Sequence, residues 1–356
     1  MHQGSRELAH VKYSGASDES TCDRSAVSSV TMNIKGLTAV FALLLLIVFA
    51  STLFYCAQQE PEVAPVAEPL DLPTRYLHAE RIVAIGDLHG DLEATRAALR
   101  LAGTIDEQDR WAGGTTVLVQ TGDQLDRGDD EFEILDLLDA LTVQAQAAGG
   151  AVHVLNGNHE LMNVKQDLRY VTLGGFLDFL PTPVANPATI EPQVVVDAVH
   201  ERLKACRPGH PFALRLLDRN VITIVGDTVF VHGGVLPHVV EYGIERLNQE
   251  TRAWIRKDRQ YPPDILLATD GPVWSRHYSD DPDAEDCRVL EETLDSLDAR
   301  RMVVGHTVSR EGISPACGEM VWRVDVGMAE HYGGIPAVLE LQNGEARVIT
   351  EELSQP

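Results

Sequence analysis

The chain has 356 residues, of which 44% are hydrophobic and 23% charged, and its formal net charge is −25. This composition is typical of a globular protein with a sizeable core, and the length fits one large domain or two ordinary ones. The negative charge argues against DNA or RNA as a partner, because phosphate backbones bind to basic surfaces. A phosphate-bearing ligand would need a local positive site, such as metal ions together with arginines.

The first 75 residues divide into three segments. Residues 1–33 are polar, rich in serine and without periodicity, and we expect them to be disordered. Residues 34–57 contain an uncharged apolar run, which is long enough to cross a bilayer as one helix; a buried core helix is the alternative. Residues 58–75 combine prolines with acidic residues and are typical of an extended linker.

The charges around the apolar run predict where the rest of the chain lies. Lys35 precedes the run, and no Lys or Arg follows it before Arg75. The positive-inside rule then places the N-terminus in the cytoplasm and everything after the run on the non-cytoplasmic, periplasmic side. Translation from Met32 would instead make the run a secretory signal peptide. Both interpretations predict a domain that is exported or anchored to the membrane.

Three cysteines, Cys206, Cys287 and Cys317, lie in the part of the chain that we expect to fold, residues 76–353. None of the cysteines forms a C-x-x-C pair, which argues against a structural zinc site. One disulfide is possible among the three in an oxidising compartment, and one thiol would remain.

The first half of the folded region alternates strands and helices. Two helices are expected to begin at Asp91 and at Asp129 or Asp130, because Asp accepts hydrogen bonds from first-turn amides, and to end near Gly103 and Gly149. This βαβαβ order predicts a parallel sheet with right-handed crossovers. Residues 163–219 are less regular and should be helical in part. The predicted strands are 81–85, 115–121, 151–155, 221–225, 228–231, 302–304, 321–326, 337–341 and 346–350.

Side chains that can bind metal follow several of these strands. Asp123 lies 36 residues after Asp87, and Asn158 lies 35 residues after Asp123, so each interval is one strand and one helix. Carboxyl ends of parallel strands meet at one edge of a sheet, where open α/β proteins place their sites. Imidazole, carboxylate and amide groups there suit two divalent metals. The candidate ligands are Asp87, His89, Asp123, Asn158, His232 and His306.

Taken in order, these motifs resemble the phosphoprotein phosphatase family of the calcineurin-like metallophosphoesterases, over about residues 81–330. The motifs are Gly86-Asp87-Leu88-His89-Gly90, Gly122-Asp123-Gln124-Leu125-Asp126-Arg127-Gly128, Gly157-Asn158-His159-Glu160, His232-Gly233-Gly234 and Gly305-His306. Asp270-Gly271-Pro272-Val273-Trp274, Val303-Val304-Gly305-His306-Thr307 and Val324-Asp325-Val326-Gly327-Met328 resemble the Shewanella-like branch. The resemblance implies an α/β fold, a β-sandwich flanked by helices, and hydrolysis of phosphate monoesters in phosphoproteins by a hydroxide that bridges two metals.

The same resemblance distributes the ligands between two divalent ions, with Mn²⁺ expected and Fe or Zn as alternatives. Asp87 and His89 would hold one ion, and Asp123 would bridge both. The other ion would be held by Asn158, His232 and His306.

The resemblance also implies roles for residues that do not bind metal. His159 would donate a proton to the leaving group, with Asp126 orienting its ring. Arg127 would bind phosphate oxygens, because a guanidinium matches their geometry. Arg276 is the candidate for a second phosphate arginine; the alternative is a surface ion pair with the acidic run 280–286.

The sequence departs from the eukaryotic members in two places. Their Ser-Ala-Pro-Asn-Tyr-Cys segment is absent, and residues 326–328 and 331–334 stand where it would fall. The interval from Asn158 to His232 is long, so we expect an insert there that shapes substrate access.

Two other functions fit the same residues. The first is a hydrolase of small phosphates or dinucleoside polyphosphates, and the second is a catalytically inactive binding module, which would require a missing ligand. Cys317 and Arg323 match the Cys-x5-Arg pattern of cysteine-dependent tyrosine phosphatases, but the stretch between them is typical of a strand rather than a phosphate loop. Trp254 and Trp322 are expected in the core.

Overall fold

The computed structural model describes residues 72–184 and 190–350. The predicted disordered segment, the apolar run and nearly all of the predicted linker lie outside these residues. Within the described part of the chain, no helix is long and apolar enough to cross a bilayer. Arg75, the last residue of the predicted linker, already belongs to the first strand, β1 (Arg75–Tyr76), and pairs with Ile224 of a neighbouring strand.

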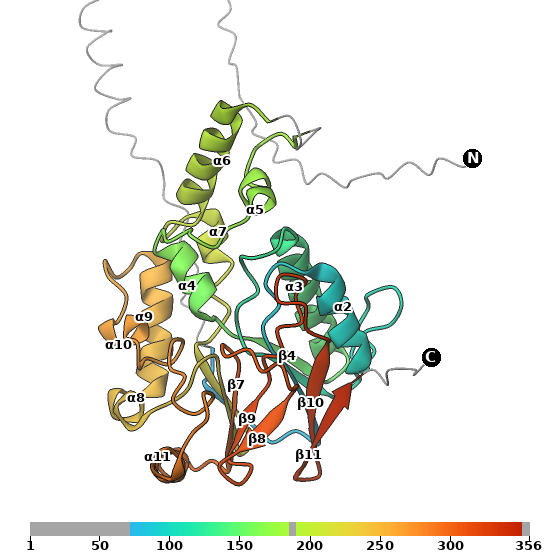
Figure 1. Cartoon of the computed structure of the whole chain (residues 1–356), viewed down its shortest axis with the longest axis vertical. Coiled ribbons are helices and arrows are strands. Elements are labelled where there is room, and N and C mark those ends of the chain that lie inside the picture. Colours follow the sequence, from blue (N-terminus) through green and yellow to red (C-terminus); the bar gives the residue numbers. More distant parts are fainter. Residues whose placement is uncertain (1–71, 185–189, 351–356) are drawn as a thin grey trace, which may run out of the picture. The chain divides into compact units, whose positions relative to one another are not determined.

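Two mixed sheets form the centre of the fold (Figure 1). The five-stranded sheet has the order β11-β10-β2-β3-β4, and the six-stranded sheet has the order β1-β5-β6-β7-β9-β8. β2, β3 and β4 are parallel neighbours, which confirms the predicted βαβαβ unit. The strands are β2 (Arg81–Ile85), β3 (Val117–Gln120), β4 (Ala151–Val154), β5 (Ile222–Val225), β6 (Thr228–Val231), β7 (Arg301–Val304), β8 (Ser314–Ala316), β9 (Val321–Arg323), β10 (Ala337–Gln342) and β11 (Glu345–Thr350).

Several strands differ from the sequence prediction: β1 was not predicted, and β3 begins at Val117 rather than at the predicted residue 115. β9 ends at Arg323, before the predicted end at residue 326, because the Asp325 carboxylate accepts a hydrogen bond from the backbone N–H of Gly327 and turns the chain. β8 was not predicted from the sequence. It lies at the edge of its sheet, where Pro315 is tolerated because an edge strand has a row of amides without partners.

Helices cover the outer face of each sheet (Figure 1). α2 (Leu92–Leu101) and α3 (Glu131–Ala147) pack against the five-stranded sheet, and they begin after Asp91 and Asp130 as predicted. The six-stranded sheet shares a second core with α4 (Asn158–Val164), α8 (Pro237–Tyr242), α9 (Ile244–Arg256), α10 (Asp264–Leu267) and α11 (Ala284–Ser296). Trp254 and Trp322 are buried in these cores, as expected.

Between Asn158 and His232, the described residues, which leave out 185–189, form three further helices: α5 (Leu173–Leu177), α6 (Pro192–Ala205) and α7 (Pro211–Leu214). Helices α5 and α6 stand next to each other beyond the sheet edge at the top of Figure 1. A small apolar cluster of Leu125, Leu135, Cys206 and Phe212 joins this insert to α3 and to the loop after β3. The insert therefore reaches the edge of the sheet where the metal ligands were predicted.

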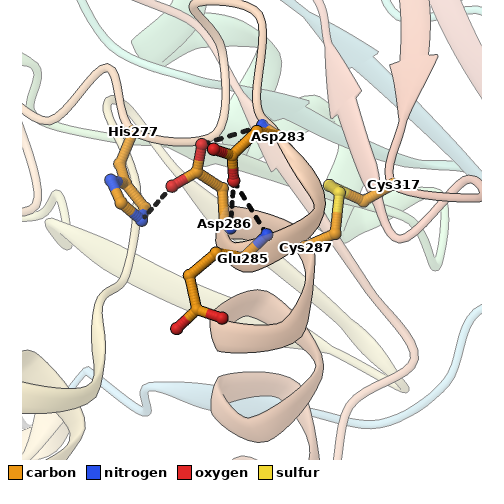
Figure 2. Close-up of a disulfide and its surroundings, with 6 residues drawn as sticks. All are labelled: His277, Asp283, Glu285, Asp286, Cys287 and Cys317. Carbon is orange, nitrogen blue, oxygen red and sulfur yellow. Dashed lines mark hydrogen bonds and ion pairs between the residues drawn. A yellow bond between two sulfur atoms is a disulfide. The ribbon is translucent and has the colours of Figure 1, made fainter.

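A disulfide links Cys287, in the first turn of α11, to Cys317, in the turn between β8 and β9 (Figure 2). The pairing confirms that one disulfide forms among the three cysteines of the folded region, and Cys206 is the free thiol of the described residues. A sulfur in a disulfide cannot act as a nucleophilic thiolate, so the Cys-x5-Arg pattern is coincidental. Burial raises the pKa of the Cys206 thiol to about 12, which makes it inert.

Candidate active site

All six predicted ligands meet where the strands of the two sheets end. His232, after β6, has its Nε2 atom 2.8 Å from Asn158 Oδ1 and 3.1 Å from Asp123 Oδ2. His89, after β2, has its Nε2 atom 3.8 Å from Asp123 Oδ2 and 3.9 Å from Asp87 Oδ2. The ring of His306, after β7, lies 4.9 Å from that of His232. Side chains from both sheets therefore share one cluster.

Asp123 lies at the centre of this cluster. Two sets of potential ligand atoms, each set within 4.8 Å, have it in common: one with His89 and His159, the other with His232 and His306. This position agrees with the predicted bridging role of Asp123. The first set contains His159, whose Nε2 atom is 3.8 Å from Asp123 Oδ2. Nε2 of His159 thus faces the centre, where it can either donate a proton or bind metal.

The imidazoles are oriented as metal ligands are. His89 Nδ1 donates to the carbonyl of Leu125 and His232 Nδ1 donates to that of Thr121, each over 3.1 Å, so Nε2 of each ring has a lone pair directed at the cluster. Burial lowers the pKa of His89 to about 4 and that of His306 to about 2. Both rings are neutral near pH 7, which is the form that coordinates metal.

The carboxylates of the cluster have the electrostatics of a cation site. Burial, together with the nearby Asp325 and Asp123, raises the pKa of Asp87 well above its usual value. Burial also acts to raise the pKa of Asp123, but the imidazoles of His232 and His159 outweigh it and lower this pKa well below its usual value. Buried carboxylates this close together are stabilised by bound cations. The donor set therefore fits a dinuclear metal centre.

The backbone around the ligands is unusually close and strained. A Cβ atom on Gly157 would lie 2.2 Å from Asp123 Oδ1, and one on Gly305 would lie 2.4 Å from Asp87 Oδ1, so only glycine fits at both positions. Several residues other than glycine have positive φ angles: His89 (47°), Asp123 (58°), Asp126 (66°), Arg127 (71°) and His306 (66°). Such conformations are concentrated at functional sites, where the surrounding structure holds them.

His159 and Asp126 form the contact that the sequence predicted. His159 Nδ1 lies 2.6 Å from Asp126 Oδ2, and Asn163 Nδ2 donates to Asp126 Oδ1 over 3.0 Å. Burial alone would lower the pKa of His159, but Asp123 and Asp126 raise it above its usual value. The geometry favours a protonated ring whose Nε2–H points into the site.

A pocket of about 100 Å³ opens onto the cluster, and Arg127 and Arg276 both line it. The Arg127 guanidinium lies 4.1 Å from the centre of the Tyr170 ring, a residue of the insert, and 5.8 Å from that of Tyr332. Arg276 Nη1 donates to the His306 carbonyl over 2.7 Å. Within the described residues Arg276 makes no ion pair with residues 280–286; Arg323 and His277 make those contacts instead.

Some residues of the site were not identified from the sequence. The Glu160 carboxylate accepts backbone N–H groups of Asp123 and Gly157 over 2.8 and 2.7 Å and so joins the loops after β3 and β4. Asp325, just after β9, lines the pocket, and its position as an acidic residue following a strand could have identified it from the sequence. The aromatic lining residues had no comparable signal, because neighbouring elements in the sequence do not predict their contacts. These residues are Tyr170, Trp274 and Tyr332.

The two-sheet fold and the cluster of metal-binding side chains define a metallophosphoesterase, a hydrolase. Residues 80–310 match the calcineurin-like phosphoesterase family, and the chain belongs to that family.

Its relatives include several protein phosphatases. The chain is 40% identical to Shewanella-like protein phosphatase 2 of Arabidopsis thaliana, over 78% of this chain and 80% of the relative. It is 31% identical to Shewanella-like protein phosphatase 1 of Plasmodium berghei, over 71% of this chain and 69% of the relative. The crystal structure of a cold-active protein-tyrosine phosphatase from a psychrophilic Shewanella species superposes with a TM-score of 0.64 and 25% identity, over 78% of this chain and 83% of that chain.

Proposed function

We propose that this protein is a phosphoprotein phosphatase that hydrolyses phosphate monoesters at a two-metal site. One observation carries the proposal: six metal-binding side chains form one cluster, and the pocket that opens onto it is lined by two arginines and by His159, which is paired with a carboxylate. The named relatives are protein phosphatases, which supports a phosphoprotein as substrate.

Each residue of the pocket has a task in this reaction. When bound, the two ions lower the pKa of the attacking water and neutralise charge that develops on the phosphate. Arg127 and Arg276 bind phosphate oxygens, and their fixed charge holds the ester against the ligand cluster. Nε2–H of His159 protonates the leaving oxygen, and Asp126 keeps the ring in the required orientation.

The surroundings of the pocket favour a phosphoprotein over a small phosphate ester. A groove of about 880 Å³ adjoins the pocket and shares His89 and Arg127 with it. This groove has room for the polypeptide on either side of a phosphorylated residue. A dinucleoside polyphosphate, the alternative substrate, would place a second phosphate group in the groove beside acidic residues such as Glu330 and Asp129, which disfavours it.

We also propose Mn²⁺ for both ions, because carboxylate and amide oxygens suit this metal; Fe and Zn are the alternatives, because they suit the imidazole ligands. Reconstitution of metal-free protein with each ion, followed by activity and metal analysis, tests this choice.

The domain is proposed to lie outside the cytoplasm, either exported or anchored to the membrane by residues 34–57. The apolar run and the asymmetry between Lys35 and Arg75 support this location, as does the disulfide between Cys287 and Cys317, since disulfides persist in oxidising compartments. Alkaline phosphatase fused after residue 75 should be active in cells. A silent fusion, together with a bright fluorescent protein at the same position, would contradict the location.

The proposed activity is tested on the purified full-length chain. Phosphotyrosine, phosphoserine and phosphothreonine peptides are compared with a dinucleoside tetraphosphate, each with and without added Mn²⁺. We expect hydrolysis of at least one phosphopeptide class to depend on metal and to exceed that of the dinucleotide. Preference for the dinucleotide would favour the small-molecule alternative, and metal binding without turnover of any substrate would favour an inactive binding module.

A further inference from the structure

Arg202, on α6 of the insert, is fully buried next to the loop that carries Asp126 and Arg127. Its side chain is 0% exposed, and its guanidinium lies 4.9 Å from the centre of the Phe179 ring. A buried guanidinium is costly unless its donors and its charge are satisfied. In Arg202, Glu131 satisfies the charge, and Glu131 and Asn163 accept hydrogen bonds from the donors.

The Arg202 guanidinium hydrogen-bonds to three side chains and to the backbone carbonyl of Gly175. Nη1 donates to Glu131 Oε2 over 2.6 Å, and Nη2 donates to Glu131 Oε1 over 3.0 Å, which is a bidentate pair. Nε and Nη2 donate to Asn163 Oδ1 over 3.0 and 2.8 Å. Nη2 also reaches Asp126 Oδ1 at 3.4 Å. The contacts with Glu131 neutralise the arginine, and those with Asn163 and Asp126 satisfy further N–H donors and join Arg202 to the residues around His159.

These contacts determine how Asn163 is oriented. Because Oδ1 of Asn163 accepts two hydrogen bonds from Arg202, its amide nitrogen must point the other way, and it donates to Asp126 Oδ1 over 3.0 Å. With Oδ1 of Asp126 held in this manner, Oδ2 is left to accept the hydrogen bond from His159 Nδ1.

The same network also holds the backbone of the loop. Glu131 Oε1 accepts the backbone N–H of Asp126 over 2.6 Å, and Asp126 has a left-handed φ angle of 66°. A residue other than glycine keeps such a conformation only where its surroundings enforce it. Arg202 fixes the carboxylate that supplies this restraint.

We propose that Arg202 is a positioning residue for the proton donor His159, acting through Asn163, Glu131 and Asp126. This positioning role rests on the proposed function, in which His159 protonates the leaving oxygen. The insert then contributes to turnover through a side chain that touches neither substrate nor metal. A misplacement of about 1 Å in a catalytic group can cost about 10²-fold in rate, so a restraint of this kind is large enough to measure.

The test compares kcat/KM for a phosphoserine peptide, whose alkoxide needs a proton, with that for nitrophenyl phosphate, whose phenolate does not. Arg202→Lys keeps the charge but cannot form the bidentate fork. Its matched control is Arg252→Lys, in a second buried arginine, which hydrogen-bonds to Asn220; neither of these residues lines the pocket. We expect Arg202→Lys to lose on the order of 10–100-fold on the peptide and several-fold less on nitrophenyl phosphate, with metals retained. The control should show no difference between the substrates.

Two further variants keep the test decisive if Arg202→Lys folds poorly. Asn163→Ala leaves Arg202 paired with Glu131 and removes the hydrogen bonds from Asn163 Nδ2 to Asp126 Oδ1 and to the His159 carbonyl, so it should show the same selective loss. In a His159→Asn background, Asn163→Ala should cost little more. Equal losses on both substrates in Arg202→Lys and Asn163→Ala, or no loss in either, would overturn the positioning role.

Failure of this inference can be told from failure of the proposed function. If His159→Asn loses more activity on the peptide than on nitrophenyl phosphate but Asn163→Ala and Arg202→Lys do not, only the positioning role of Arg202 is wrong. If His159→Asn itself shows no selectivity, the proposed proton donor is wrong.

Discussion

His159 Nδ1 and Asp126 Oδ2 lie 2.6 Å apart, although 33 residues and the whole of α3 separate them in the chain. The contact exists because β3 and β4 are parallel neighbours whose following loops meet at one edge of the sheet. It directs the other ring nitrogen of His159 towards Asp123.

From this geometry we expect His159→Asn to lose about 10²–10⁴-fold in kcat/KM on alkyl phosphates, the usual range for general acid catalysis, and less on nitrophenyl phosphate. Metal content measured on the same preparation serves as the control and should be unchanged. Because His159 Nε2 is also within reach of the ligand set, a loss of metal would identify the residue as a ligand, and the assignment of the site would have to be redrawn.

Asp123→Asn should lose both metals and nearly all activity, because Asp123 belongs to both sets of potential ligand atoms. Mass-spectrometric metal analysis alongside phosphatase assays checks this. Asp136→Asn is the matched control, since Asp136 is an exposed partner of Arg215 on the outer side of α3. An active Asp123→Asn protein that still holds two ions would exclude the bridging role.

Arg276→Ala should weaken phosphate binding. A hydrogen bond to a charged group contributes about 1.5–3 kcal/mol, so the inhibition constant for inorganic phosphate should rise by about 10–100-fold. Thr307→Val removes one acceptor of the same guanidinium without touching its charge, and it should have a smaller effect. If phosphate inhibits the Arg276→Ala protein as strongly as the parent, Arg276 serves only to hold the loop at His306.

Replacing both cysteines of the disulfide, in Cys287→Ser/Cys317→Ser, should lower the free energy of unfolding. The cross-link closes a loop of 30 residues, for which chain entropy predicts about 3–4 kcal/mol. Denaturant unfolding measures the change. Reductant should destabilise the parent protein by a similar amount and leave the double variant unaffected; a reductant effect on both proteins would point to another cause.

Asp178→Asn should stabilise the protein near neutral pH. Asp178 is exposed to solvent, but partial desolvation, followed by repulsion from Glu133 and Asp129, raises its pKa to about 6. The folded state therefore holds its proton more tightly than the unfolded chain, and stability falls as pH rises from about 4 to 6. Thermal melts of Asp178→Asn and the parent should coincide at pH 4 and differ at pH 7. An equal difference at both pH values would show that titration is not the cause.

Local sequence patterns were sufficient for much of the site. Residues that follow buried strands, such as Asp87, Asp123 and Asn158, could be placed at one sheet edge, because parallel strands connected by helices end on the same side. One capping residue was informative for a similar reason: the Asp91 side chain accepts the backbone N–H of Ala94 in the turn that follows it, which is a short-range interaction. Asp130 marks the start of α3, but its carboxylate accepts the backbone N–H of Leu92 in α2 rather than an amide of its own helix.

The tertiary structure decided which distant groups meet. The sequence allowed one disulfide among three cysteines but did not identify the partners, since pairing depends on where the fold places α11 relative to the turn between β8 and β9. It offered no sign that Arg202 of the insert would reach Asp126, because the energy of that buried network depends on groups from α3, α4 and α6 that become neighbours only when the chain folds. The sequence by itself thus determined where the predicted metal ligands lie, through local strand-end chemistry, whereas long-range packing determined what holds His159 in place.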